Sequence, residues 1–403
     1  MTVTSSVTPP EPATAPPGRS LGERIGNELS FLPVAIGLVV LFAFFATQSD
    51  VFLTSRNLNN LLIQSTVTGI IALGLVFVLL TGEIDLSVAA TSGLASVIMA
   101  KIVVDFGLPV PLAVLAGVFC GIVIGAASGR WITLIGVPSF VVTLGVGLVL
   151  NGLQLMLLPN TGRYNLLNTG VDRVAATNVS GPVAWLIVLV AVAGFGALQW
   201  STWRSRRAEG LPAGLTGSVI LPTAVVGALL LGMLLFLENM RGLPMPVILF
   251  LALLGLMSYV ASETRFGLYL YAIGDNAEAA RRAGINVDRI KITAFAIAGG
   301  MAALGGILAA SRILGVSVSS GGGVGGGALL LESIAAAVIG GVSLFGGRGK
   351  VVGALFGALI IATVSNGLNL MGVANEARLI VTGLLLVAAV SVDRGIERLA
   401  GPR

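Results

Sequence analysis

The sequence predicts an all-α polytopic membrane protein with about 10–12 transmembrane helices, and three observations lead to this prediction. Apolar residues make up 56% of the 403 residues and charged residues only 10%. The mean hydropathy is +1.00, and apolar runs of about 20 residues, the length that crosses a bilayer as a helix, recur along the chain. A soluble domain carries about 25% charged residues, so this chain cannot cover itself with a solvated surface. The spans leave only short connections, which excludes a separate soluble catalytic domain.

The polar residue types exclude several kinds of site. The chain has no histidine and one cysteine, Cys120, which excludes an internal disulfide, a histidine-ligated metal and a histidine general base. The excess of 23 Lys+Arg over 18 Asp+Glu gives a net charge of +5. Because the basic residues are scattered between apolar runs, they predict membrane orientation rather than nucleic-acid binding. The sequence therefore predicts no catalytic residue, no metal, no cofactor and no nucleic-acid partner.

The N-terminal segment differs from the rest of the chain. Residues 1–30 contain five prolines among Ser, Thr and Ala, which is typical of a disordered tail. The apolar run that follows is long enough to span the bilayer, whereas a secretory signal has a shorter apolar core and a small-x-small cleavage site. We expect a disordered cytoplasmic tail over 1–30, a single membrane domain over 31–393 and a second cytoplasmic tail over 394–403.

The apolar runs place the predicted spans in order along the membrane domain. Two of them start unusually: the third begins in the acidic segment 82–85, and the tenth follows the glycine-rich segment 321–327. Each of these two is expected to be a full span or a broken or re-entrant helix. The expected spans are 31–48, 61–80, 84–104, 112–128, 138–158, 182–200, 219–237, 244–261, 292–311, 328–346, 351–371 and 377–392.

Basic residues are distributed unequally between the two sides of this layout. An even number of spans places both termini on one side, and that side holds 16 of the 23 basic residues. The positive-inside rule makes it the cytoplasmic side, so both termini are expected to be cytoplasmic. The other side keeps seven isolated basic residues: Arg56, Lys101, Arg163, Arg173, Arg241, Arg312 and Arg378.

A weak internal similarity predicts an inverted repeat. Segment 83–96 aligns with segment 330–343, which pairs Asp85 with Glu332. The two segments cross in opposite directions in the predicted layout, as inverted-topology repeats do. Chance similarity between Ala- and Gly-rich helices is the alternative. A second similarity, between 151–156 and 366–371, has a different offset and cannot report the same duplication.

Three carboxylates lie within the apolar segments: Glu83, Asp85 and Glu332. A charged group at membrane depth costs about 2.5 to 3.5 kcal/mol, so such residues usually line a cavity or pair with another group. A helix break at this place would let Glu83 and Asp85 face an aqueous path, with the hydroxyls of Ser87 and Thr91 beside them. The alternative is that the two acids cap the following helix or lie at its interface.

Two pairs of amide side chains stand three residues apart, so each pair shares one helix face. Asn151 and Gln154 form the first pair, and Asn366 and Asn369 form the second. These amides have the hydrogen-bonding groups to bind sugar hydroxyls. The alternative is that they join neighbouring helices through hydrogen bonds.

Segment 262–291 is longer and more charged than its neighbours and carries the signals of a short capped helix. Asp275 and Glu278 stand at capping-box spacing, and Gly284 is placed to end the helix. A helix capped at both ends between two spans predicts docking to a cytoplasmic partner. The alternative is a surface helix at anionic headgroups. The predicted docking residues are Asp275, Asn276, Glu278, Ala279, Ala280, Arg281, Arg282 and Gly284.

At these residues the sequence resembles a known family. The stretch from Glu278 to Gly284 resembles the Glu-Ala-Ala-x-x-x-Gly loop through which bacterial ABC importer permeases engage their ATPase. Three further stretches resemble the ribose/xylose permease family: Glu83-Ile84-Asp85-Leu86-Ser87, Val137-Pro138-Ser139-Phe140-Val141-Val142-Thr143-Leu144 and Ala335-Ala336-Ala337-Val338-Ile339-Gly340-Gly341. The additional pair of spans over 182–237 is similar to the D-xylose branch. Ala89, where the family commonly has glycine, and Ser128-Gly129-Arg130, where it often has Asn-Gly, depart from the pattern.

The resemblance implies a type II ABC importer permease in the bacterial plasma membrane that forms a homodimer around the path of a pentose, D-xylose. It implies a cytoplasmic ATP-binding subunit that binds 275–284 and an extracytoplasmic sugar-binding protein that docks outside, including on 159–181. The partner subunit uses ATP, so the chain itself is expected not to be an enzyme. Ribose or another small sugar is the alternative cargo. The translocation path candidates are Glu83, Asp85, Ser87, Thr91, Asn151, Gln154, Glu332, Asn366 and Asn369.

Two other classes of protein remain as alternatives. A proton-coupled secondary transporter would use Glu83, Asp85 or Glu332 as its proton site, and such transporters also have inverted repeats and broken helices. It would have no use for a docking helix. A membrane-embedded enzyme would have few candidate catalytic residues, because the sequence contains no histidine and no pair of cysteines.

Overall fold

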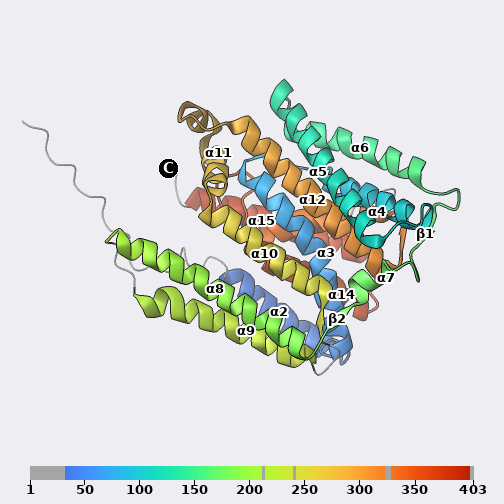
Figure 1. The fold of residues 1–403 in the computed structure, drawn as a ribbon, viewed down its shortest axis with the longest axis horizontal. Coiled ribbons are helices and arrows are strands. Elements are labelled where there is room, and N and C mark those ends of the chain that lie inside the picture. Colours follow the sequence, from blue (N-terminus) through green and yellow to red (C-terminus); the bar gives the residue numbers. More distant parts are fainter. Residues whose placement is uncertain (1–31, 211–213, 239–241, 323–327, 400–403) are drawn as a thin grey trace, which may run out of the picture.

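The computed structural model describes residues 32–210, 214–238, 242–322 and 328–399. Within these residues the chain is predominantly helical, and most long helices lie along one common direction (Figure 1). The tail expected over 1–30 lies outside the described residues. At the other end α15 continues to Leu399, so the described part of the predicted C-terminal tail is helical.

The elements follow one another as a series of helices with two small strand pairs. The helices are α2 (Leu32–Gln48), α3 (Ser55–Leu80), α4 (Val88–Val104), α5 (Val110–Ile135), α6 (Ser139–Leu157), α7 (Asp172–Ala176), α8 (Pro182–Ala208), α9 (Leu221–Glu238), α10 (Met245–Glu263), α11 (Arg265–Arg282), α12 (Val287–Ile313), α13 (Ala328–Ile339), α14 (Gly353–Leu370) and α15 (Asn375–Leu399). A π-turn, η1 (Thr216–Ile220), precedes α9, and a 3-10 turn, η2 (Ser320–Gly322), precedes α13. Antiparallel pairs form between β1 (Arg163–Asn165) and β4 (Gly315–Ser317), and between β2 (Asn178–Val179) and β3 (Leu243–Pro244).

Eight helices of the described part are long and apolar enough to cross a membrane, and each overlaps a predicted span. They are α3, α5, α6, α8, α9 with its preceding turn, α10, α12 and α14. Helices α2, α4 and α13 are apolar but shorter. The all-α polytopic fold class is therefore confirmed.

The two spans that start unusually are both interrupted. The third begins only at Val88, because 82–87 are not helical. The tenth ends at Ile339 rather than at residue 346, so α13 has 12 residues. At 1.5 Å per residue it is about 18 Å long, too short for a hydrocarbon core of about 30 Å. Of the two expectations for 328–346, a full span or a broken or re-entrant helix, the structure shows the broken helix, because Gly341 takes a left-handed conformation (φ +88°) that ends it.

Helices α3 and α12 form the centre of the bundle and pack antiparallel. A Cβ on Gly74 would lie 2.7 Å from Cβ of Met301, and one on Gly305 would lie 2.5 Å from Ile71. The missing side chains let the two backbones approach closely, which is how helices gain packing energy in a membrane. Residues 69–80 of α3 are all buried.

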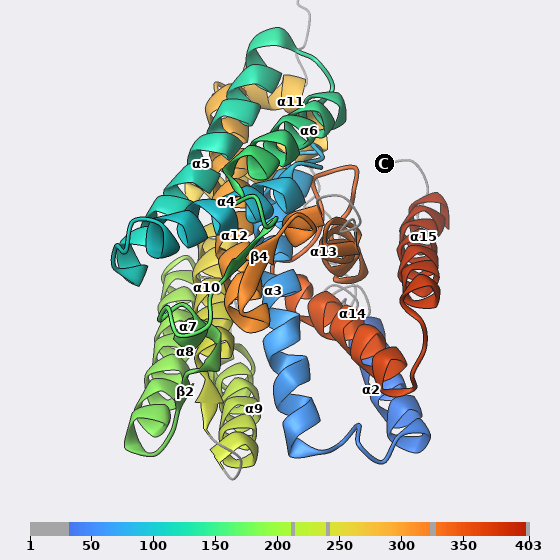
Figure 2. The same ribbon diagram turned by 90° about the vertical axis from the view of Figure 1, so that its right-hand side faces the viewer.

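The contacts between helices follow an inverted repeat, in which the antiparallel helices α3 and α12 correspond; α13, α14 and α15 of its second half lie at the right of Figure 2. Helix α5 packs on α12 and α14 packs on α3; α4 contacts α5 and α6, and α13 contacts α14 and α15. Exchanging α3, α4, α5 and α6 with α12, α13, α14 and α15 therefore preserves the contacts. The predicted alignment selects the correct helix pair, α4 and α13. The predicted residue-by-residue alignment is not reproduced, because Asp85 precedes α4 whereas Glu332, its predicted counterpart, lies inside α13.

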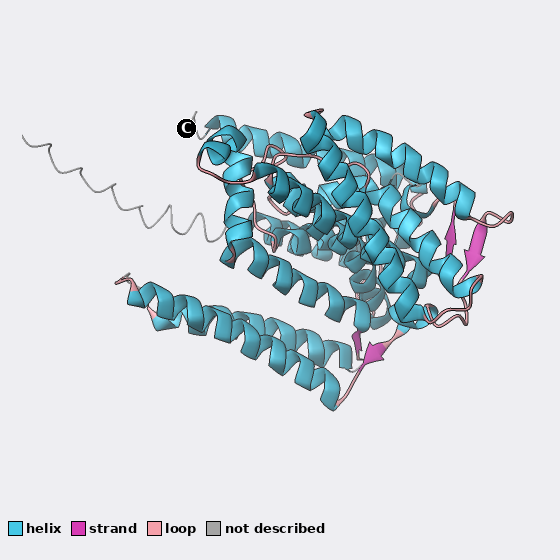
Figure 3. Cartoon of the chain, turned by 45° about the horizontal axis from the view of Figure 1, so that its top comes forward, coloured by secondary structure: helices cyan, strands magenta, loops and turns pink. Residues whose placement is uncertain are grey.

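The additional pair of spans forms the hairpin of α8 and α9, which lies to one side of the repeat (Figure 3). One end of the hairpin packs on the rest through an apolar cluster that includes Ala184, Val188, Leu234, Leu237 and Leu243.

Candidate functional site

The chain leaves its helical course between α3 and α4, where Glu83 and Asp85 lie. Gly82 takes a left-handed conformation (φ +78°) at this place, which glycine adopts without the penalty that a Cβ brings. Asp85 is 1% exposed, and its Oδ1 accepts hydrogen bonds from the Ser87 backbone N–H at 2.8 Å and hydroxyl at 2.6 Å. Both bonds go to the residue that precedes α4. Asp85 thus shapes the start of this helix, in agreement with the structural alternative, and its part in a path stays a prediction.

Two hydroxyl groups of α6 hold this break in place. Ser139 Oγ accepts a hydrogen bond from the N–H of Ile84 at 3.1 Å, and Thr143 Oγ1 accepts one from the N–H of Leu86 at 3.1 Å. They satisfy backbone donors that lie outside any helix. These two hydroxyls are not among the residues predicted from the sequence, although a serine and a threonine four residues apart at the start of an apolar helix indicate one polar face.

Glu83 forms an ion pair with Lys291 of α12, which stands 208 residues further along the chain. Each side chain is 17% exposed, so the pair is shielded from most of the solvent. The sequence places Lys291 only among the cytoplasmic basic residues, because a single sequence carries no signal for a contact between such distant positions. The ion pair connects the non-helical segment after α3 with the beginning of α12.

The backbones of three segments meet next to Glu83 at a glycine junction formed by Gly82, Gly274, Gly346 and Gly347. A Cβ on Gly274 would lie 2.0 Å from the carbonyl oxygen of Leu80 and 2.2 Å from the nitrogen of Gly347. The N–H of Gly347 donates a hydrogen bond to the same carbonyl oxygen at 3.0 Å. Helix α11, the end of α3 and the loop after α13 thus touch through backbone atoms.

The docking helix predicted from the sequence is the last part of α11. The helix is kinked at Asn276 (φ −158°, ψ 100°), and Asn276 Oδ1 accepts a hydrogen bond from the N–H of Ala279 at 2.9 Å, as an N-cap residue does. The docking helix therefore comprises residues 277–282. The predicted capping box is wrong by one residue, because Asn276 and not Asp275 is the cap. Glu278 pairs with Arg282 at 3.2 Å instead.

Gly284 ends the docking helix as predicted, in a left-handed conformation (φ +85°). Its N–H donates to the carbonyl of Arg281 at 3.0 Å, and the N–H of Ile285 donates to the carbonyl of Ala280 at 3.1 Å. These two bonds form a Schellman motif. Arg281 also pairs with Asp288 of α12 at 3.3 Å. The docking helix is thus capped at both ends and attached to α12.

Gln154 connects α6 with the segment that contains β4 and η2. Its Nε2 donates hydrogen bonds to the carbonyl oxygens of Ser317 and Ser320, each at 3.0 Å. Its buried Oε1 has no hydrogen-bond partner among the described residues. A cavity of about 170 Å³ lies beside this segment between α4, α12 and α13, and its polar lining comes from Ser92, Ser96, Ser319 and Ser320.

The second amide pair lies elsewhere in the bundle. Asn366 and Asn57 exchange two hydrogen bonds between their side-chain amides at 2.9 Å, which join α14 to the beginning of α3. This contact is the interhelical alternative predicted for such amides. Asn369 is exposed on α14. Both residues therefore lie near the end of α3 opposite to Asp85.

The remaining candidates occupy different environments. Thr91 is buried in the first turn of α4, one turn beyond Ser87. Asn151 is half-buried on α6, and its Oδ1 has no hydrogen-bond partner among the described residues. Glu332 lies in α13 and is half-buried. The structure groups Asp85, Ser87 and Thr91 at the start of α4.

Comparison with known proteins agrees with this architecture. Residues 57–390 match the family described as the branched-chain amino acid transport system / permease component. The chain is 36% identical over 292 residues to the xylose transport system permease protein XylH of Escherichia coli, with 72% of this chain and 74% of that protein covered. It is 35% identical over 297 residues to XylH of Haemophilus influenzae, with 71% and 76% covered.

A more distant relative is the autoinducer 2 import system permease protein LsrC of Salmonella typhi, which is 28% identical over 297 residues, with 73% of this chain and 67% of that protein covered. No solved structure matches this chain. The family match extends from α3 to α15 and so includes both repeats, the glycine junction and the docking helix. The chain therefore belongs to the family of permease components of branched-chain amino acid transport systems.

Proposed function

We propose that the chain is the permease subunit of an ATP-driven importer of D-xylose and forms the translocation path as a homodimer. The observation that carries this proposal is the docking helix, which is capped at both ends and connected to the helix break at Glu83 through Gly274 and Lys291. If the ATP-binding subunit displaced this helix, these contacts would also displace the start of α4. The similarity to two xylose permeases supports the choice of sugar.

Permeases of this family are not enzymes, because ATP hydrolysis belongs to a separate subunit. The family also implies a substrate-binding partner, and it sets aside the proton-coupled transporter and the membrane-embedded enzyme. We assign the docking helix to the ATP-binding subunit. We assign the opposite face, around α7 and the β1–β4 pair, to the sugar-binding protein. We also propose that both termini of the permease are cytoplasmic.

A neutral sugar is bound by hydrogen bonds rather than by a fixed counter-charge. The start of α4 offers Asp85, Ser87 and Thr91, and the cavity of about 170 Å³ offers serine hydroxyls. The side-chain oxygens of Asn151 and Gln154, which have no hydrogen-bond partner in the described part of the chain, are available as acceptors. We propose that the path follows α4 along these groups. Glu83, in contrast, is assigned to coupling because it is paired with Lys291.

Competition transport tests the choice of sugar. Proteoliposomes that contain the permease, its ATP-binding subunit and its sugar-binding protein should accumulate labelled D-xylose in an ATP-dependent way. Unlabelled D-xylose should abolish the signal, whereas ribose in tenfold excess should leave most of it. Stronger competition by ribose, or by the autoinducer 2 ligand, would assign the importer to that cargo instead.

A further inference from the structure

The hairpin of α8 and α9 carries a groove that the proposed transport function does not use. The hairpin lies beside the repeat (Figures 1 and 3). Only 11% of the residues in the most apolar stretch of α8 are buried, and 17% of those in the corresponding stretch of η1 and α9. Its apolar cluster with the rest of the chain lies at the end that carries Ala184 and Leu237. The other end, which carries Trp200 and η1, holds the groove.

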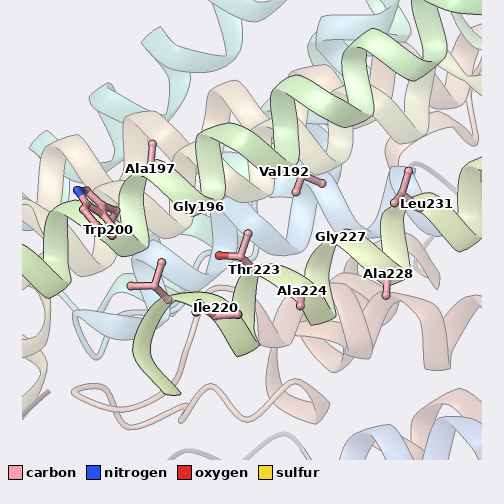
Figure 4. Close-up of a pocket in the computed structure, with 11 residues that line it drawn as sticks. Val192, Gly196, Ala197, Trp200, Ile220, Thr223, Ala224, Gly227, Ala228 and Leu231 are labelled. Atoms are coloured by element: carbon pink, nitrogen blue, oxygen red, sulfur yellow. The ribbon is translucent and has the colours of Figure 1, made fainter. Parts of the chain in front are cut away.

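Figure 4 shows this groove between the two helices. Small residues bring the helices together, since a Cβ on Gly196 would lie 3.2 Å from Cγ2 of Thr223 and one on Gly227 would lie 3.4 Å from Val192. The groove beside this contact has a volume of about 790 Å³, and apolar side chains form its lining apart from Thr223. The hydroxyl of Thr223 is buried and has no hydrogen-bond partner among the described residues.

A positively charged cluster lies at the Trp200 end of the groove. The rings of Trp200 and Trp203 are 5.0 Å apart, and the Arg207 guanidinium lies 5.0 Å from the centre of the Trp203 ring. Arg204 and Arg206 are exposed on the same turns of α8. No carboxylate in the described part of the chain lies within ion-pair distance of the three arginines.

We propose that the groove binds an anionic glycerophospholipid. An acyl chain would lie in the apolar groove, the Thr223 hydroxyl would donate a hydrogen bond to a glycerol ester, and Arg204 and Arg207, which share the groove face of α8, would hold the phosphate. Arginine binds phosphate through charge-assisted hydrogen bonds, and basic pockets between membrane helices bind anionic headgroups.

The dimensions of the groove suit this occupant. It extends from Ile220 to Leu231, about 16 Å at 1.5 Å per residue, which is most of the length of an acyl chain. Arg204 follows Gly196, the residue opposite Thr223, by two turns or about 12 Å, a separation that a lipid phosphate and an arginine side chain span together. A second copy of the chain is a less suitable occupant of the groove. Under two-fold symmetry it would place its own arginine cluster near this one and leave the positive charges of both without a counter-charge.

Lipid titration of the purified full-length chain tests this proposal. Native mass spectrometry should show that phosphatidylglycerol binds at least about tenfold more tightly than phosphatidylcholine with the same acyl chains. The double variant Arg204→Gln, Arg207→Gln should weaken phosphatidylglycerol binding by about thirtyfold. The matched control Arg265→Gln, Arg289→Gln, which removes two exposed arginines elsewhere, should leave binding unchanged.

Two variants of the groove separate lipid binding from general stability. Thr223→Val keeps the shape of the side chain and should weaken phosphatidylglycerol binding by about fivefold without lowering the melting temperature. Ala228→Phe fills the groove and should abolish tight binding while all arginines remain. Equal affinity for the two lipids, or undiminished binding in the arginine variant, would overturn the proposal. A change of oligomeric state in Ala228→Phe with unaltered lipid binding would also overturn it and assign the groove to a second copy.

Discussion

Lys291 donates a hydrogen bond from Nζ to Oε1 of Glu83 and thereby joins the beginning of α12 to the break between α3 and α4. The docking helix precedes α12 by four residues and contacts it through the Arg281–Asp288 ion pair. On its other side the glycine junction attaches α11 to the end of α3. Two sets of contacts, one electrostatic and one between backbones, therefore connect the docking helix with the start of α4.

Removal of one partner of this ion pair should uncouple transport from ATP hydrolysis. Glu83→Gln or Lys291→Met leaves a shielded charge unpaired, at a cost of up to about 3 kcal/mol. Sugar uptake should fall more than about tenfold, while the ATP-binding subunit still binds and hydrolyses ATP at its basal rate. ATPase assays with and without the sugar-binding protein check this result.

The exchanged pair Glu83→Lys, Lys291→Glu should recover most of the uptake, because it restores the attraction. The pair of Lys101 and Asp105, at 2.8 Å on the predicted outer side, is a matched control. Tyr164 also donates to this carboxylate, and the two donors hold the pKa of Asp105 below its usual range. Asp105→Asn should leave coupling intact; loss of coupling there, or no recovery in the exchanged pair, would contradict the role of Glu83 and Lys291.

The long helices were predictable because apolar length is a local property of the sequence. Each of the eight long helices overlaps a predicted span, although α3, α5, α8 and α12 extend beyond theirs by several residues. Helix α13 shows the limit of this signal: the apolar run continues beyond Ile339, but the left-handed Gly341 and the contact between the backbones of Gly340 and Gly353 turn the chain away. Hydropathy contains no information on such backbone contacts.

The docking helix was predictable because both of its caps are local patterns, and the error of one residue arises because Asp275 and Asn276 both fit an N-cap. The partners of Glu83 and Gln154 were not predictable. Lys291 and Ser317 lie 208 and 163 residues away from them, so only the packing of α3, α6 and α12 brings them together.

Gly274→Ala should be strongly destabilising. The added Cβ would meet backbone atoms of Leu80 and Gly347, which cannot rotate away, so α11 must shift at a cost of about 3 kcal/mol or more. Thermal unfolding in detergent should show a clear decrease in melting temperature. In the control Gly255→Ala no atom of the described residues lies within 4 Å of the new Cβ, and the melting temperature should not decrease. Equal behaviour of the two variants would refute the close backbone contact.

Gly284→Val should misplace the docking helix without preventing membrane insertion. Valine in a left-handed conformation costs about 1 to 2 kcal/mol, and the Schellman motif would open. Pull-down of the ATP-binding subunit and its stimulation by the sugar-binding protein should both decrease. Gly383→Val on α15 serves as control, because a Cβ there meets no atom within 4 Å among the residues that the structure describes. Unchanged stimulation in Gly284→Val would show that the helix does not dock.

Cysteine labelling tests the proposed orientation. In a variant with Cys120→Ala, an impermeant thiol reagent added outside should label Leu167→Cys in the segment after β1. It should not label Glu209→Cys, which follows α8. Leu167 is 52% exposed, and it avoids the left-handed conformation of the neighbouring Asn168 (φ +60°). Labelling of Glu209→Cys from outside would show that the orientation is the reverse of the proposed one, with the docking helix on the outer side of the membrane.

Uptake of D-xylose into proteoliposomes with the complete importer, measured while an ionophore collapses the pH gradient, tests the central claim most directly. Uptake should require ATP and persist without the gradient. Asp85→Asn should retain much of it, because the amide oxygen still accepts the bonds from Ser87, whereas Asp85→Leu should lose it. Uptake that needs the gradient, ignores ATP and disappears in Asp85→Asn would contradict the account, because an amide does not titrate.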